Sequence, residues 1–182
     1  IGYDGLTNHI LTYIKNMRKD DLQIDLVSAR DIDPNIMPLL QTIGFNQIFR
    51  IECRDRNQIK YLYRLMRLIR TNKYDIVHVH GNSATLAVDM IAAYLGGCRH
   101  RIAHAHNTSC QHAILNKILK PFFEISYTEA FACGKEAGEW LFGKNKEVYI
   151  VKNGKDLDHF RYDENIRKKI RKELRLADGM IA

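Results

Sequence analysis

Histidine, asparagine and threonine gather at two points of the sequence where short apolar runs end. The first is HVHGNS at 78–83, where His78 and His80 are two residues apart and would project from one face of a strand. Asn82 or Ser83 follows as a candidate N-cap of the next helix. Near neutral pH, histidine can donate or accept a hydrogen bond. His80 and Asn82 are therefore candidate substrate-binding residues, with packing and a loop hydrogen bond as the alternative.

The second point is HAHNTS at 104–109, again where an apolar run ends. In open parallel sheets ligands bind at the carboxyl ends of strands, so two such clusters would face one crevice. His106 is the candidate catalytic residue, and Asn107 and Thr108 are candidate substrate-binding residues. Paired histidines also occur in metal sites. Because no carboxylate or cysteine completes a ligand set at short spacing, no metal is expected.

Two further stretches have a chemistry suited to phosphate. Gly2 and Gly5 precede a predicted helix, so backbone N–H groups and the helix N-terminus could approach an anion. The pattern is not G-x-G-x-x-G, and a plain turn is the alternative. Lys135 begins another predicted helix, where it could contact a phosphate or simply be solvated. All three are candidate substrate-binding residues.

The chain is basic, with a net charge of +7 and a pI near 9.2, which favours anionic partners. Part of the charge lies on a predicted helix from Arg56 to Lys73. A solvated face is one explanation, and contact with an anionic membrane surface is another. Nucleic acid is not expected, because no recognition motif is present. The sequence pattern predicts an apolar face of Ile59, Leu62, Met66 and Ile69, with Tyr63 beside it, and a basic face of Lys60, Arg64 and Arg67.

Other classes of protein are disfavoured. The four cysteines have neither metal-knuckle spacing nor the pattern of a secreted disulfide framework, so reduced thiols are expected. The sequence has no run of about 18 apolar residues, so no transmembrane helix is expected. The first residues do not have the pattern of a signal peptide.

Short apolar runs alternate with longer helical patterns, which predicts an α/β fold with a mainly parallel sheet. Right-handed crossovers would place helices on both faces, giving three layers. A glycine turn normally follows a first strand, which we expect upstream of Ile1. The expected strands are 22–28, 45–51, 74–80, 101–106, 129–133 and 148–151, and the expected helices are 7–18, 56–71, 83–95, 113–127, 135–142 and 164–174.

Four ordered blocks resemble family 4 glycosyltransferases of capsular and exopolysaccharide synthesis: YDIVHVHGNSAT from 74, RIAHAHNTS from 101, EAFACGKEAGEWLFG from 129 and VYIVKNGKDLDHF from 148. The resemblance implies one Rossmann-like half of a GT-B fold. Residues 1–152 would form the acceptor-side domain, and residues 153–182 would lead to a donor-binding domain. The sequence departs from the family pattern at two points. The usual glycine pair of the first loop is spread out here as Gly2 and Gly5, and Lys155 occupies a position where the family usually has an apolar residue.

The resemblance also implies an activity. A sugar would pass from a nucleotide-sugar donor to a saccharide or lipid-linked acceptor, without an obligatory metal or cofactor, at the cytoplasmic face of a membrane. His106 would lie near the transferred sugar, and Gly2 and Gly5 near the donor phosphate and acceptor. The isolated chain is expected to be inactive. The alternative is a non-catalytic module that binds a phosphorylated or nucleotide ligand or a partner protein.

Overall fold

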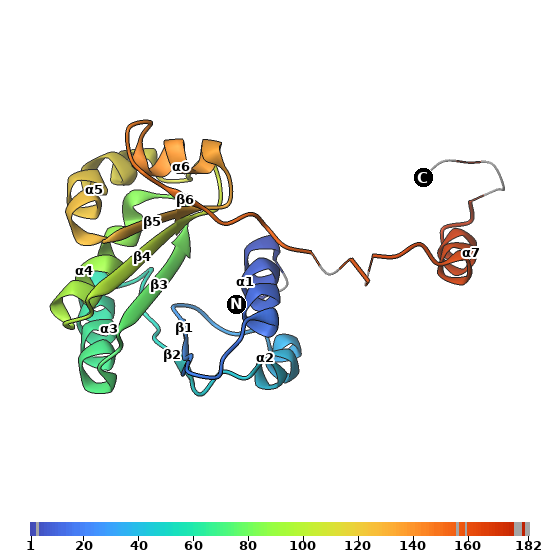
Figure 1. Ribbon diagram of the computed structural model, residues 1–182, viewed down its shortest axis with the longest axis horizontal. Coiled ribbons are helices and arrows are strands. Elements are labelled where there is room, and N and C mark those ends of the chain that lie inside the picture. Colours follow the sequence, from blue (N-terminus) through green and yellow to red (C-terminus); the bar gives the residue numbers. More distant parts are fainter. Residues whose placement is uncertain (3, 156, 159, 177–179, 181–182) are drawn as a thin grey trace.

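The computed structural model describes residues 1–2, 4–155, 157–158, 160–176 and 180 (Figure 1). Tyr3 of the glycine turn, residues 156 and 159 of the segment expected to lead to a donor-binding domain, and most of the last six residues lie outside the described part. Helices and strands alternate as predicted. The elements are α1 (Gly5–Asn16), β1 (Leu26–Ser28), η1 (Pro34–Ile36), α2 (Met37–Ile43), β2 (Ile48–Arg50), α3 (Gln58–Asn72), β3 (Ile76–Gly81), η2 (Ala84–Leu86), α4 (Ala87–Leu95), β4 (His100–Ala105), α5 (Ala113–Ser126), β5 (Glu129–Ala132), α6 (Lys135–Phe142), β6 (Tyr149–Ile150) and α7 (Glu164–Glu173).

All strand pairs are parallel, which confirms the predicted sheet type, but the strands form two sheets. One contains β1 and β2, and the other has the order β3-β4-β5-β6. In the larger sheet His80 of β3 is in register with His104 of β4. The carboxyl ends of both strands therefore reach the same edge, which confirms the arrangement expected from the sequence.

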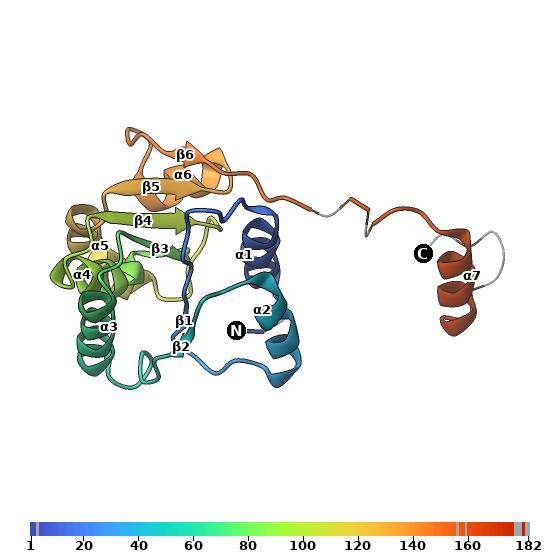
Figure 2. The same ribbon diagram turned by 60° about the horizontal axis from the view of Figure 1, so that its bottom comes forward.

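Helices cover the two faces of the larger sheet unequally. Ala103 and Ala105 of β4 are fully buried in a core with side chains of α4, α5 and α6. Because side chains alternate along a strand, His104 points to the opposite face, where the ring of His9 on α1 approaches it. Figure 2 shows α1 beside the carboxyl ends of the strands. A second core joins α3 to α4, and a third joins α1 and α2 to β1 and β2. This arrangement fits the predicted three layers.

Residues 34–43, where the sequence pattern predicts no element, form η1 and α2. Pro34 lies in the first turn of η1 and Pro38 in the first turn of α2. The backbone N–H groups of a first turn have no partner within the helix, so proline, which has no N–H, costs no hydrogen bond there. Asp33 caps η1, because its carboxylate accepts from the backbone N–H of Asn35 at 2.9 Å. Gly44 ends α2 in the left-handed conformation, with φ of 89°.

The predicted apolar face of α3 is partly wrong. Tyr61, Leu65 and Ile69 are its buried residues, while Ile59 is 83% exposed. Positions 61, 65 and 69 recur at helical spacing along the line that packs on α4, and Ile59 in the first turn lies off that line. The basic side chains of Lys60, Arg64 and Arg67 are exposed, as predicted.

Ser83 is the N-cap residue of the next helix, η2, as one of the two expected candidates, but it does not cap the helix with its side chain. Instead, the side-chain oxygen of Asn116 on α5 accepts from the N–H of Ala84 at 2.6 Å. A tertiary contact thus replaces the local cap. The four cysteines are free, and none of the helices in the described part of the chain has the length and apolar character needed to cross a bilayer.

Candidate functional site

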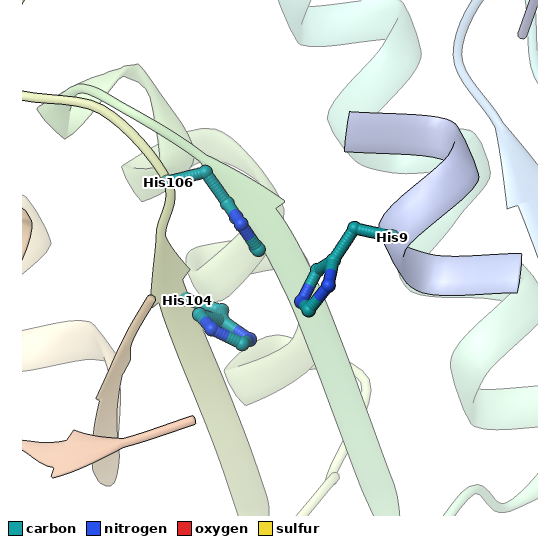
Figure 3. Close-up of side chains that lie close together, drawn as sticks. All are labelled: His9, His104 and His106. Atoms are coloured by element: carbon teal, nitrogen blue, oxygen red, sulfur yellow. The ribbon is translucent and has the colours of Figure 1, made fainter. Parts of the chain in front are cut away.

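Five histidines form one cluster between the larger sheet and α1. They are His78 and His80 of β3, His104 of β4, His106 just beyond β4, and His9 of α1. Figure 3 shows the rings of His9, His104 and His106 turned toward one another. The cluster lies at the carboxyl ends of two adjacent parallel strands, where α/β folds bind ligands.

Hydrogen bonds join the two strands through their histidines. His78 Nε2 lies 3.1 Å from His104 Nδ1, and His80 Nδ1 lies 2.9 Å from His106 Nε2. The rings of His78 and His80 stack at 4.2 Å between centroids, so both project from one sheet face, as predicted. In each bonded pair one ring must donate and the other accept, so each pair restricts the tautomers of both rings.

His9 closes the cluster from the helix. Asp4 caps α1, since its carboxylate accepts from the N–H of Thr7 at 2.8 Å, and His9 lies in the turn that follows. The centroid of the His9 ring is 5.2 Å from that of His106 and 6.2 Å from that of His104. His9 Nδ1 and His104 Nε2 are buried without a hydrogen-bond partner. Such groups call for an explanation in a folded protein.

Burial keeps the cluster uncharged near neutral pH. Desolvation, followed by repulsion from neighbouring histidines, lowers the pKa of His104 to about 3. The same causes lower the pKa of His106 to about 4 and that of His80 well below its ordinary value. The pKa of His9 is lowered by burial and then by the positive charge of Lys155. Neutral rings can still donate or accept hydrogen bonds and bind metals.

These shifts predict that the protein loses stability in acid. An unfolded histidine titrates near pH 6.5, so below that pH the unfolded state binds more protons than the folded state. The stability due to neutral His104 and His106 is complete above about pH 6.5 and is lost as the pH falls toward 3–4. Leucine does not titrate, so the free energy of unfolding of His104→Leu should fall by a few kcal/mol less than that of the wild type as the pH is lowered. The conversion is about 1.4 kcal/mol per unit of pKa shift.

Urea unfolding at several pH values measures the effect. The relevant quantity is the difference between His104→Leu and wild type, because carboxylates titrate in the same range. His112→Leu, at an exposed position outside the cluster, should keep the wild-type pH dependence. Parallel curves for His104→Leu and wild type between pH 6.5 and 4 would contradict the prediction.

The chain after β6 passes close to α1 (Figure 1). The Tyr13 hydroxyl of α1 donates to the backbone carbonyl of Lys152. A Cβ at Gly154 would lie 3.5 Å from the Tyr13 ring, and the charge of Lys155 acts on His9. The block that begins at 148 thus reaches the same edge of the sheet as the histidines.

The structure brings some predicted site residues together and leaves others apart. His80 and His106 are in direct contact. Gly5 begins α1, the helix that carries His9, and Gly2 accepts from the N–H of Asp4 at 3.0 Å. The region around both glycines is open, because an added Cβ would meet nothing within 4 Å.

The other four predicted residues make only local or structural contacts among the described residues. The carbonyl of Asn82 accepts from the indole N–H of Trp140 at 3.1 Å. The Asn107 side chain accepts from the N–H of the exposed Thr108 at 2.7 Å. Lys135 is exposed, and its ammonium lies 3.8 Å from a carboxylate oxygen of Glu139. Their binding roles stay predictions.

His9 is missing from the predicted site, and the sequence pattern gives His104 no role of its own. His104 has a signal in the sequence, since it precedes His106 by two residues and must share its side of the strand. His9 has a weaker signal: it lies one turn into the helix that follows the glycine turn.

Comparisons with known proteins identify what this architecture resembles. The model of Glycosyltransferase Family 4 matches residues 3–159. EpsF of Bacillus subtilis (strain 168), named as a candidate glycosyltransferase, is 24% identical over 167 residues, which cover 86% of this chain and 43% of EpsF. HepE of Anabaena, solved in complex with UDP, has a TM-score of 0.64 and 16% identity over 95% of this chain and 47% of HepE.

A second solved structure, MnaA of S. aureus with UDP, has a TM-score of 0.59 and 17% identity over 90% of this chain and 47% of MnaA. At these identities the two structures establish the fold alone. This chain spans about half the length of the relatives that it matches.

Proposed function

This chain belongs to glycosyltransferase family 4, and we propose on that premise that it forms the acceptor-side half of a sugar-transferring enzyme. The enzyme, of the hexosyl or glycosyl transferase class (EC 2.4), would move a sugar from a nucleotide-sugar donor to a saccharide or lipid-linked saccharide in surface polysaccharide synthesis. The observation that carries the proposal is the neutral histidine cluster at the carboxyl ends of β3 and β4, beside the N-terminal half of α1.

The proposed mechanism relies on positioning and on electrostatic stabilisation. Holding donor and acceptor in facing domains supplies proximity, and closing the domains excludes water that would hydrolyse the donor. Backbone N–H groups near Gly5 at the start of α1 would stabilise negative charge on the leaving nucleotide. His106 would hydrogen-bond near the transferred sugar, with its ring held by His80. In this role it orients the sugar and is not a nucleophile.

A uridine diphosphate sugar is the donor that we propose, because HepE and MnaA were each solved with UDP. The test is release of UDP from UDP-sugars by the protein at its natural length, with and without saccharide and lipid-linked acceptors. Release that depends on the acceptor supports the proposal. The isolated 182 residues should show no useful turnover. Nucleotide binding without transfer would favour a non-catalytic binding module instead.

Gly5→Ala tests the role of the first loop without disturbing the fold. An added Cβ would meet nothing within 4 Å, and alanine is a better helix former than glycine, so stability should be unchanged or slightly higher. If a donor phosphate approaches this backbone closely, the methyl group should weaken donor binding about tenfold or more. Isothermal titration with UDP and thermal unfolding measure the two effects. Unchanged UDP affinity would leave Gly5 as a turn residue only.

We also propose that the basic face of α3 rests on an anionic membrane surface on the cytoplasmic side. Lys60, Arg64 and Arg67 are exposed there beside the exposed Ile59 and Tyr63. A basic residue near an anionic surface contributes about 1 kcal/mol. Reversing two charges with Arg64→Glu and Arg67→Glu should therefore weaken binding to phosphatidylglycerol vesicles at least about tenfold.

Vesicle sedimentation provides the measurement, and the chain offers a control of equal charge. Lys15→Glu with Lys144→Glu changes the net charge by the same amount at exposed positions off α3. Equal weakening by both double variants would show only an effect of net charge and would contradict a specific role for α3.

A further inference from the structure

The outer face of α5 carries an apolar row that the described part of the chain leaves exposed. Its four members recur at helical spacing. They are Ile114, Ile118, Phe122 and Ile125, which are 79%, 59%, 52% and 81% exposed. The inner face of the same helix is apolar too, because Phe123 is fully buried in the core of the larger sheet and Leu119 packs against that core. A helix that is apolar on both faces is normally buried on both.

The apolar row continues onto the C-terminal end of α4, where Tyr94 and Leu95 are exposed. The guanidinium of Arg101 lies 5.4 Å from the centre of the Tyr94 ring, and its Nε donates to the backbone carbonyl of Ser126 at 2.7 Å. Arg101 thus joins the C-terminal ends of the two helices, which lie side by side against the larger sheet (Figure 1). Exposed apolar patches larger than a few hundred Å² are rare on monomers and mark interaction sites.

We propose that this patch is the contact surface between two copies of the chain, which pack with their α5 helices antiparallel about a twofold axis. Such a contact requires a surface that is complementary to itself. The row meets this requirement, because it is nearly symmetric about position 120. In the antiparallel pair Ile114 would face the partner's Ile125, and Ile118 would face the partner's Phe122.

Two exposed charges beside the row have the same symmetry. Lys117 and Glu124 are seven residues apart, which places them within about 20° of each other around the helix, on the flank toward α6. A twofold axis between antiparallel helices sets each flank beside the same flank of the partner. Lys117 would therefore lie opposite the partner's Glu124, and this pair would occur twice in the dimer. A parallel arrangement would set opposite flanks together and lose both pairs, so the charges favour the antiparallel orientation.

A membrane surface is a less suitable occupant of this patch. Helices that lie in a membrane interface are rich in lysine and arginine on their polar face. On α5 the exposed charges are one lysine and one glutamate, because Lys120 turns toward α6 and donates to the backbone carbonyl of Leu141. The proposal does not depend on sugar transfer, so its test can succeed or fail separately from the transfer assay.

Sedimentation of the protein at its natural length, without lipid, tests the contact. The expected result is a dimer at micromolar concentration. Ile118→Glu and Phe122→Glu should each raise the dissociation constant of the dimer at least about 100-fold, because each places one carboxylate per copy inside an apolar contact. Ile59→Glu is the matched control: it changes an isoleucine that is equally exposed, on α3 and away from the patch, and should dimerise like the wild type.

A charge exchange tests the antiparallel orientation. Lys117→Glu should raise the dissociation constant about tenfold, because it sets like charges opposite each other at two places. Adding Glu124→Lys restores opposite charges and should return the dissociation constant to within about threefold of the wild type. The doubly exchanged protein has the net charge of the wild type and an unchanged apolar row. If the second exchange gives no recovery, the antiparallel arrangement is wrong.

Two further outcomes would overturn the contact as a whole. One is a protein that stays monomeric at tens of micromolar. The other is dimerisation of folded Ile118→Glu and Phe122→Glu variants with wild-type affinity, where circular dichroism establishes the folding. A monomer that binds phospholipid vesicles, and loses that binding with Ile118→Glu but not with Ile59→Glu, would assign the patch to a lipid surface instead.

Discussion

Replacing His106 with alanine in the enzyme at its natural length is expected to lower turnover about 100-fold while weakening donor binding less than about threefold. The physical reason is that a preorganised hydrogen bond near the transferred sugar contributes most where charge develops in the transition state, at about 10²–10³ per donor. The ring is already oriented by His80 at 2.9 Å and is neutral, because burial lowers its pKa to about 4. It can therefore act without reorganising.

Steady-state transfer kinetics and equilibrium binding of UDP-sugar separate the two effects. His106→Gln keeps a hydrogen-bonding side chain and should recover part of the lost turnover. His112→Ala lies outside the cluster and should leave both quantities unchanged. If His106→Ala retains wild-type turnover, His106 does not belong to the site. If turnover and donor affinity fall equally, the residue binds the ground state and gives no selective help to the transition state.

The histidine pairs show how far local sequence determines this site. The period of two along a strand predicts that His78 and His80 share a face, and the strand ends predict that His106 lies beside them. Both expectations depend only on backbone geometry. The helix predicted at 135–142 has the bounds of α6, and backbone geometry again explains the agreement. Gly134 is the N-cap residue, and the glycine after Phe142 has a φ of 91°, which ends the helix.

His9 and Asn116 show where local reasoning stops. Each reaches its partner through the packing of helices that are far apart in the sequence: α1 against β4 in one case, and α5 against the start of η2 in the other. The amphipathic pattern of α3 allows several neighbouring faces, and only contact with α4 selects the one centred on Tyr61 and Leu65. Periodicity predicts that a face is buried, but its exact direction depends on the partner.

Asp89 supports the stability of that same helix pair. It is 3% exposed on α4, where its carboxylate accepts from the Tyr61 hydroxyl at 2.7 Å and from Arg54 Nη2 at 2.5 Å. Burial raises the pKa of Asp89, and the guanidinium of Arg54 and the hydroxyl of Tyr61 act against that rise. Folding therefore depends on these two partners to offset the desolvation of the carboxylate.

Asp89→Ala is accordingly expected to lower the free energy of unfolding by about 3–5 kcal/mol, because it leaves a half-buried guanidinium and a buried hydroxyl without their partner. Asp55→Ala is the matched control: its carboxylate is 3.3 Å from Arg30, but both side chains are more than 60% exposed, so the loss should stay below about 1 kcal/mol.

Asp89→Asn distinguishes charge from hydrogen bonding. If the carboxylate is ionised against Arg54, the amide should destabilise almost as much as alanine does. If burial keeps it protonated, the amide should cost little. Urea unfolding of the three variants decides between these cases. A loss below about 1 kcal/mol for Asp89→Ala would show that the bonds of Asp89 to Arg54 and Tyr61 do not stabilise the packing of α3 on α4.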